Sequence, residues 1–371
     1  MSHLTYAEAI VVGLIQGVTE LFPVSSLGHN VLIPALVGGQ WAQDLSVSKP
    51  ESPYLAFIVG LHVATAVAMI IYFWRDWVRI IGGFFSSLRE RRVATADQRL
   101  AWMIILATIP VGIAGLALEH LFRVVFSKPV PTALFLAVNG LILLSAERQR
   151  RRSADARASA WGGSAPAWEG SAPAAPAWEG GMAAQGARDH AVAGTRYPAQ
   201  RGYPGGGGYH PLPGSHAAQP QGSRQRETER EQETERAVAA DRRLSMMGYG
   251  RATLIGAAQI LALLPGISRD GIVTVIGMTR GLNREDAVRY SFLLSAPVIL
   301  AAGMLKIPDL FGPLGAGIHG QVLVASLVSG IGAYLSIRYL VRYFSKSRTL
   351  TPFAIYCLVA GLGSLAYFAI R

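Results

Sequence analysis

Two short polar stretches, each broken by proline or glycine, interrupt long apolar sequence and constrain this chain more than any other feature. The first, residues 16–29, contains Glu20 and His29, and the second, residues 264–271, contains Arg269. An ionisable side chain at bilayer depth costs about 3 kcal/mol or more unless something compensates it. Irregular backbone is tolerated there only where protein or a water-filled cavity surrounds it. The two stretches therefore predict a polar cavity inside a membrane protein.

Several apolar segments reach, or nearly reach, the length needed to cross a bilayer. Of the 371 residues, 51% are hydrophobic and only 15% are charged. About 20 apolar residues cross a bilayer, although about 17 suffice. The expected spans are residues 54–74, 100–118, 131–146, 290–305, 321–340 and 352–370. We therefore expect an all-α polytopic membrane protein.

Residues 148–248 differ in composition from the rest and divide the chain into two halves, 1–147 and 249–371. This segment is rich in Ala, Gly, Pro, Ser and Arg. Such a segment buries too little apolar surface to offset its chain entropy, so we expect a disordered low-complexity loop. A mixed-charge run from Arg224 to Arg243 at its exit could form a solvated helix through i,i+4 pairs, or no fixed structure.

The two halves resemble each other once this segment is removed. Four residues recur at a constant offset of 243 positions, namely Gly13, Gln16, Ser25 and Gly28 as Gly256, Gln259, Ser268 and Gly271. Each half reads as a broken hairpin, at about 5–36 and about 251–280, followed by about three transmembrane helices. This shared order predicts an internal duplication.

Loop charge predicts that the two halves have opposite orientations. The loops at 75–99, 280–289 and 342–348 are rich in arginine, whereas 37–53 and 309–320 contain a single lysine between them. The positive-inside rule then places the basic loops and the 148–248 segment in the cytoplasm and both termini outside. The broken hairpins enter as re-entrant loops from opposite faces, as in transporters built from inverted repeats.

The net charge of +11 follows the same pattern, because basic residues gather between the expected spans. This distribution favours anionic membrane lipids as partners and argues against nucleic acid. The single cysteine, Cys357, excludes a disulfide framework and a cysteine-based metal site.

The first hairpin combines polar side chains with a helix N-terminus. Gln16 and Glu20 are four residues apart and therefore share one face of a helix. A proline ends that helix, and Ser25 or Ser26 then caps a second helix whose free N–H groups form an anion site. His29 follows in the first turn and can face the same way.

The second hairpin repeats the construction with a fixed cation. Ser268 caps a helix that carries Arg269 and Asp270 in its first turn. A guanidinium matches phosphate oxygens bidentately, and the adjacent helix N-terminus adds to the attraction. A carboxylate, an imidazole, hydroxyls and an arginine are the groups that phosphoryl transfer uses.

Structural interpretations stay open beside this one. Glu20 could simply pair with Arg269, since buried ions usually pair. Ser25 and Ser26 could be plain helix caps, and Asp270 could only neutralise its neighbour. His62, inside an apolar span, is expected to be a packing residue.

At these residues the chain resembles the undecaprenyl-diphosphatase family of bacterial membrane proteins, which is associated with bacitracin resistance. The matching motifs are Gln16-x-x-x-Glu20, Phe22-Pro-Val-Ser-Ser-Leu-Gly-His29, Pro265-Gly-Ile-Ser-Arg269, Ser291-Phe-Leu-Leu-Ser-Ala-Pro297 and Pro352-Phe-Ala-Ile-Tyr356. The resemblance covers most of 5–147 and 249–371. It implies a multi-pass enzyme of the bacterial plasma membrane that hydrolyses undecaprenyl diphosphate to undecaprenyl phosphate and so recycles the cell-wall lipid carrier.

The resemblance also implies roles for individual residues. The expected catalytic residues are Glu20, Ser26, His29 and Arg269, and the expected substrate-binding residues are Gln16, Ser25, Ser268 and Arg269. A divalent cation, Mg²⁺ or Ca²⁺, is expected near Glu20, with Gln16 or Asp270 as a further ligand. The substrate is a polyprenyl diphosphate lipid, and a homodimer is one oligomeric state that stays open.

Two alternatives to this enzyme remain. A transporter or flippase for polyprenyl phosphate is one, because inverted repeats with broken helices are typical of carriers. An inactive paralogue is the other, because Asp270 and Val273 stand where the family usually has Ser and Thr. The nucleophile, Ser26 or a water activated by Glu20, is also open.

Overall fold

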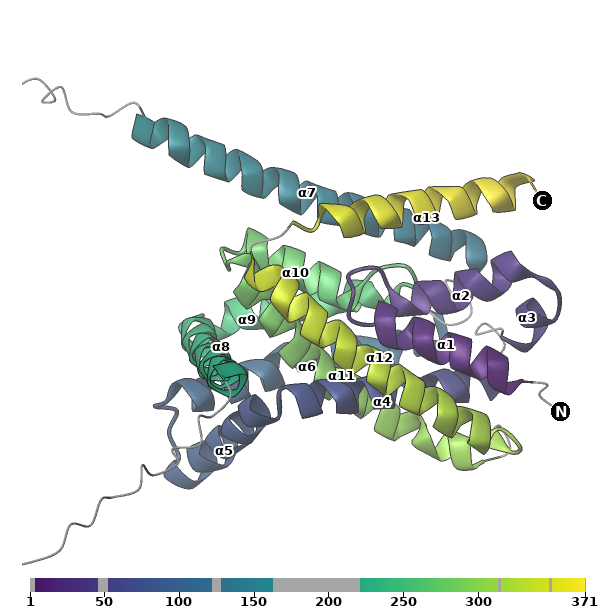
Figure 1. Ribbon diagram of the computed structural model, residues 1–371, viewed down its shortest axis with the longest axis horizontal. Coiled ribbons are helices and arrows are strands. Elements are labelled where there is room, and N and C mark those ends of the chain that lie inside the picture. The colour runs from purple at the N-terminus through teal and green to yellow at the C-terminus, as the bar shows by residue number, and fades with distance from the viewer. Residues whose placement is uncertain are drawn as a thin grey trace, which may run out of the picture. The chain divides into compact units, whose positions relative to one another are not determined.

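The structure is a computed structural model that describes residues 4–45, 53–121, 128–162, 221–312, 315–346 and 349–370. These described residues form helices joined by turns, without a strand among them (Figure 1). The elements are α1 (Tyr6–Thr19), α2 (Ser26–Val37), α3 (Gly39–Asp44), α4 (Pro53–Tyr72), α5 (Trp74–Glu90), α6 (Ala96–Leu121), α7 (Pro129–Gly162), α8 (Gln221–Ser245), α9 (Tyr249–Ala257), the 3₁₀ helix η2 (Ala258–Leu263), α10 (Arg269–Thr279), α11 (Arg284–Phe311), α12 (His319–Ser345) and α13 (Thr351–Ile370).

The long apolar helices confirm an all-α membrane protein. Within the described residues, α6, α7, α11, α12 and α13 are each long and apolar enough to cross a membrane. Helices α4 and α5 give a sixth candidate if they count as one span, although they are bent by 86° at the break between them. Five of the six apolar segments singled out in the sequence each lie in one of these helices, and the two short ones belong to longer helices. The sixth, 54–74, covers α4 and ends at the first residue of α5.

The segment between the halves contains more helix than its composition predicts. Helix α7 continues past residue 148 to Gly162, and α8 forms the helical exit from Gln221 to Ser245. Helix therefore extends into the expected loop from both of its ends. Glu147 binds Arg150 at 3.0 Å one turn further along α7, which favours the continued helix. The disorder expected for 163–220 falls outside the described residues.

Ion pairs attach the C-terminal part of α8 to the helices beside it. The buried carboxylate of Asp241 accepts hydrogen bonds from Arg79 of α5 at 2.6 Å and from Arg289 of α11 at 2.8 Å. Arg243 donates to both carboxylate oxygens of Asp286, at 2.8 and 2.6 Å. Residues 232–245 therefore belong to the same compact unit as residues 1–152 and 246–371.

Glycines let α1 approach α12 closely. A Cβ atom on Gly13 would lie 2.5 Å from the Ala325 carbonyl oxygen, and one on Gly17 would lie 2.3 Å from that of Ser329. Small residues at such positions let helix backbones meet within a membrane. This contact fixes the end of α1, from which Glu20 extends.

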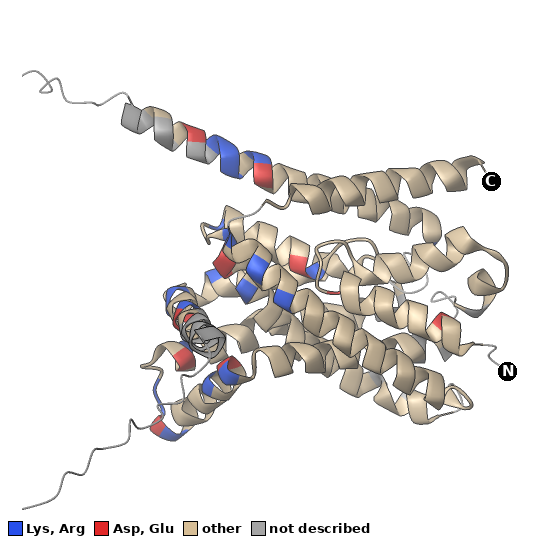
Figure 2. Cartoon of the chain, in the orientation of Figure 1, with Lys and Arg blue, Asp and Glu red and all other residues tan. Residues whose placement is uncertain are grey.

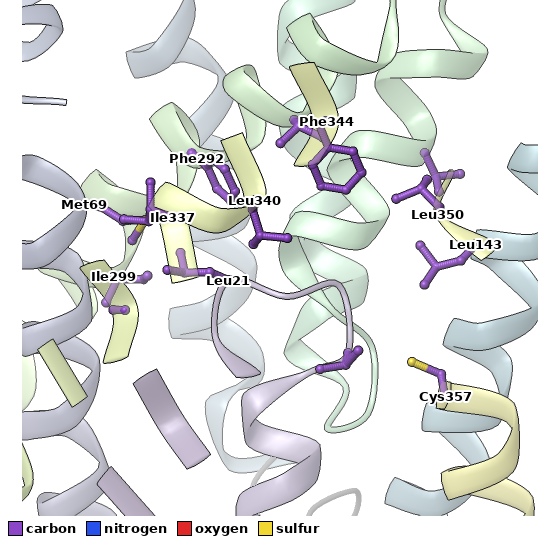
Figure 3. Packing of buried hydrophobic residues seen from close by; sticks show 14 of the residues in the cluster. Leu21, Met69, Leu143, Phe292, Ile299, Ile337, Leu340, Phe344, Leu350 and Cys357 are labelled. Carbon is purple, nitrogen blue, oxygen red and sulfur yellow. The ribbon is translucent and has the colours of Figure 1, made fainter. Parts of the chain in front are cut away.

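Apolar side chains hold the chain directly after Glu20. Leu21 is 1% exposed and packs in a cluster with Ile299, Ile337 and Leu340 from α11 and α12 (Figure 3). The broken backbone of the first hairpin is therefore anchored on an apolar core rather than held in solvent.

Charged residues are distributed unevenly over the helices. Figure 2 shows Lys and Arg on α5, α8 and the C-terminal half of α12, whereas α2, α3 and α13 carry almost no charge. The charged positions near the start of α10 stand out against these apolar surroundings. They belong to the polar stretches from which the sequence predicts a cavity.

Gly17→Ala is expected to destabilise the protein, because the added methyl group collides with the Ser329 carbonyl. Overpacking of this kind costs about 1–3 kcal/mol. The measurement is the temperature at which half of the detergent-purified protein loses its monodisperse elution. The control is Gly112→Ala on α6, where the new Cβ meets no atom within 4 Å. Equal midpoints for the two variants would refute the close α1–α12 contact.

Candidate active site

The two broken hairpins meet at their breaks, although 241 residues separate the atoms in contact. The Ser25 hydroxyl oxygen accepts hydrogen bonds from the backbone N–H of Gly266 at 3.1 Å and of Gly28 at 3.3 Å. Ser25 itself adopts a φ of 69°, which is strained for a residue with a side chain. A Cβ on Gly28 would lie 3.0 Å from the Gly266 Cα, so only glycine permits this approach without displacement.

Asn139, on α7, connects the same two breaks through hydrogen bonds to the backbone of each. Its Nδ2 donates to the Pro23 carbonyl at 3.0 Å, and its Oδ1 accepts from the Ser268 N–H at 3.1 Å. Asn139 is fully buried. The side chain therefore satisfies one backbone group in each break, a requirement for irregular backbone inside a membrane.

Each break is followed by a capped helix. Ser25 is the N-cap of α2, and Ser268 is the N-cap of α10, where its hydroxyl accepts from the Gly271 N–H at 3.1 Å. The sequence left Ser25 and Ser26 as alternative caps. Because Ser25 takes that role, the Ser26 hydroxyl is available for a different contact.

The Glu20 carboxylate collects four donors or potential donors. Its Oε1 accepts from Nη2 of Arg269 at 2.6 Å. Its Oε2 accepts from Nε2 of Gln16 at 2.9 Å and from the hydroxyl of Ser26. The Glu20 side chain is only 3% exposed, whereas that of Arg269 is 20% exposed. The arginine thus compensates a buried negative charge and still reaches the surface of the site.

His62, on α4, is the fourth group at this carboxylate, which the packing interpretation from the sequence missed. Its Nε2 lies 3.3 Å from Oε2 of Glu20. Its Nδ1 lies 2.9 Å from the Ile58 carbonyl oxygen, which can only accept, so Nδ1 carries a proton. A hydrogen bond between Nε2 and the carboxylate then requires one further proton. The Glu20–His62 pair is therefore a place where a proton can be held.

The side-chain amide of Asn30 orients that of Gln16. Asn30 donates from Nδ2 to Oε1 of Gln16 at 2.7 Å, which turns the amino group of Gln16 toward Glu20. Oδ1 of Asn30 is buried and has no hydrogen-bond partner among the described residues. Asn30 was not among the predicted site residues. Its position directly after His29, at the end of the first polar motif, is the sequence signal that marks it.

His29 makes different contacts from those that the sequence suggested. Its Nδ1 binds the Ser25 carbonyl at 2.7 Å, and its Nε2 lies 2.7 Å from the Tyr356 hydroxyl on α13. The two rings are stacked, with centroids 5.7 Å apart. Both ring nitrogens are therefore engaged away from the Glu20 carboxylate, next to the strained residue Ser25.

Asp270 also points elsewhere. Its Oδ1 accepts from the Ser295 hydroxyl on α11 at 2.7 Å. Within the described residues, no three His, Cys, Asp or Glu side chains lie close enough together to hold a metal ion. Both Glu20 oxygens already face donors, and Oε1 of Gln16 accepts from Asn30. These residues therefore do not form a ready set of oxygen ligands for a divalent cation.

Comparison with known proteins gives a consistent match. A family model described as "Bacitracin resistance protein BacA" matches residues 9–165 and 226–363. The chain is 54% identical over 370 residues to a protein of Mycolicibacterium paratuberculosis named "Undecaprenyl-diphosphatase", covering 100% of this chain and 99% of that one. It is 50% identical to "Undecaprenyl-diphosphatase 2" of Frankia alni, with full coverage of both chains. A protein of the same name from Chromobacterium violaceum is 33% identical, over 97% of this chain and 98% of that one.

Asn139→Leu is expected to destabilise the protein, because it leaves the Pro23 carbonyl and the Ser268 N–H buried without partners. Each unsatisfied group costs about 1–3 kcal/mol. Thermal unfolding of the purified protein measures the loss. Ser145→Ala serves as the control, because that exposed hydroxyl on the same helix bonds only the Ile142 carbonyl of its own turn. A variant at Asn139 as stable as this control would show that Asn139 does not hold the breaks together.

Proposed function

The chain belongs to the BacA family of bacitracin resistance proteins, and we propose from this that it is a membrane-embedded undecaprenyl-diphosphatase. Relatives that carry that name are 50–54% identical over the whole chain. The reaction releases phosphate from undecaprenyl diphosphate and leaves undecaprenyl phosphate. The observation that carries the proposal is the contact of Glu20 with both Ser26 and Arg269, groups from two distant hairpins.

Substrate binding uses the positive groups of the site. One Nη of Arg269 holds Glu20, and the remaining N–H groups of its partly exposed guanidinium can bind phosphate oxygens. The N-termini of α2 and α10 meet at the breaks and add their free N–H groups and dipoles. The polyprenyl tail stays among the apolar helices, which explains why such a phosphatase lies within the membrane.

The geometry favours Ser26 as the nucleophile over water. Its hydroxyl donates to Glu20, the arrangement of a nucleophile beside its base. Ser26 Oγ attacks the terminal phosphorus and its proton passes to the Glu20–His62 pair. The bond from that phosphorus to the bridging oxygen breaks, and undecaprenyl phosphate leaves with the electron pair. Water then attacks the phosphoserine, and the bond from phosphorus to Ser26 Oγ breaks. The Glu20–His62 pair returns its proton to Ser26, and the proton of the water leaves with the phosphate.

The roles expected for the other site residues and for a divalent cation stay predictions. His29 as a proton-transfer group is less favoured than His62, because its ring binds Ser25 and Tyr356. The positions of Gln16, Ser25 and Ser268 support roles in orienting Glu20 and the two helix N-termini. Dependence on Mg²⁺ or Ca²⁺ also stays a prediction. The proposed attack by Ser26 and the cleavage of the phosphoserine do not require a cation.

Reciprocal contacts support an inverted repeat with two re-entrant hairpins. Gly13 and Gly256, which correspond at the offset of 243, each lie in the first helix of their hairpin. Gly13 packs on Ala325 of α12 in the second half, and Gly256 packs on Ala107 of α6 in the first. The corresponding Ser25 and Ser268 cap α2 and α10 in the same way. A two-fold relation between the halves predicts this exchange of partners.

Glu20→Gln and Arg269→Gln are each expected to lower phosphate release from undecaprenyl diphosphate by at least about a hundredfold, since each removes a charge at the reacting groups. The control is Glu8→Gln, on the same helix as Glu20, because glutamine preserves its capping contact with Thr5. Near-normal release by either site variant, with the wild-type rate in the control, would end this assignment. Wild-type protein that moves lipid phosphate between leaflets but releases no phosphate would favour a transporter instead.

His62→Gln is expected to lower kcat by about a hundredfold or more, because glutamine can donate to Glu20 but cannot hold the transferred proton. His319→Gln is the control, since that ring, at the start of α12, contacts the Leu310 carbonyl and the Phe311 ring rather than Glu20. Full kcat in His62→Gln would reduce His62 to a positioning residue.

A further inference from the structure

Three cations lie together on the surface at the C-terminal end of α12, where Lys346 is the C-cap. Arg338, Arg342 and Lys346 are spaced four residues apart, so they share one face of the helix, and all three are exposed. Among the described residues, no carboxylate pairs with them. By contrast, carboxylates bind Arg79, Arg243, Arg284 and Arg289, which lie between packed helices.

These cations line a groove of about 360 Å³. Leu335, Tyr339 and Tyr343 complete its walls. Tyr339 stacks on Phe22 with ring centroids 5.9 Å apart, and Tyr343 packs against Phe353 at 5.6 Å. The tyrosines are therefore held in place by the first hairpin break and by α13, and the groove is a formed surface rather than a set of loose side chains.

An apolar stripe continues from the groove along the same helix. Leu323, Leu327, Ile331 and Leu335 are also spaced by four residues and are 63%, 61%, 62% and 59% exposed. From residue 323 to residue 335 the helix rises about 18 Å, close to the thickness of one leaflet of a hydrocarbon core about 30 Å thick. The apolar stripe thus leads to a zone in which cations and tyrosines alternate, as a lipid's chains lead to its interface and headgroup.

We propose that this groove binds the phosphate headgroup of an anionic bilayer phospholipid, with the acyl chains along the stripe. Three unpaired cations complement the phosphate charge, and the stripe has the length of acyl chains confined to one leaflet. The lining of the groove includes none of the candidate active-site residues. The proposal stands independently of the phosphatase reaction.

The test compares Arg338→Gln/Arg342→Gln/Lys346→Gln with a matched triple variant of the full chain. The matched variant, Arg148→Gln/Arg151→Gln/Arg152→Gln, removes the same charge from exposed positions of α7. Native mass spectrometry of delipidated protein titrated with phosphatidylglycerol or phosphatidylcholine measures bound lipid. Each cation near an anionic lipid contributes about fivefold in affinity, so the α12 variant is expected to bind phosphatidylglycerol roughly a hundredfold more weakly. Phosphatidylcholine binding changes little, and the α7 variant keeps the high-affinity lipid.

Several outcomes would overturn the proposal. Equal losses in the two triple variants would mean that net charge alone attracts lipid, and unchanged binding in the α12 variant would mean that the groove holds none. A competition titration with polyprenyl monophosphate distinguishes the two lipid sources. Displacement of phosphatidylglycerol by an equimolar amount would assign the groove to the polyprenyl lipid instead. Phosphate release by the α12 variant at the wild-type rate confirms that the protein is folded.

Discussion

The buried carboxylate of Glu20 is the constraint on which the centre of this molecule depends. A negative charge in apolar surroundings persists only with a cation and with hydrogen bonds to its oxygens. Here the cation, Arg269, belongs to the other half of the chain, 249 positions away. The salt bridge of Glu20 therefore forms only when the two halves of the chain pack against each other. Assembly of the site and assembly of the membrane bundle are therefore one event.

Backbone requirements lead to the same arrangement. The breaks that place Glu20 and Arg269 leave backbone groups without helical partners, and Ser25 and Asn139 supply partners for groups in both breaks. The strain at Ser25, with its φ of 69°, is held by these contacts. The break before α2 and the break before α10 are thereby joined, and each helix N-terminus is a potential anion site. In the proposed reaction, Glu20 adds what backbone cannot supply, a base for the Ser26 hydroxyl.

The sequence predicted the parts of this site that obey local rules. Proline and serine at fixed offsets predicted the breaks and caps, and two opposite charges in apolar sequence predicted the contact of Glu20 with Arg269. His62 escaped prediction because its neighbours along α4 are apolar, and periodicity cannot say which distant group a helix face meets. Asn139 was missed for the same reason. The helical extension of α7 to Gly162 was not predicted, because low apolar content indicates disorder. Charge pairs within one helical turn favour helix there instead.

Paired and unpaired cations in this bundle suggest how it binds two lipid phosphates differently. Arg269 is already bonded to Glu20, so a phosphate must compete with a carboxylate for part of its guanidinium. In the proposed reaction this competition weakens phosphate binding, which favours release of the charged products. The cations of α12 face no such competitor among the described residues, and their groove continues into an apolar stripe. A paired arginine thus suits turnover, and unpaired cations suit a lipid that stays bound.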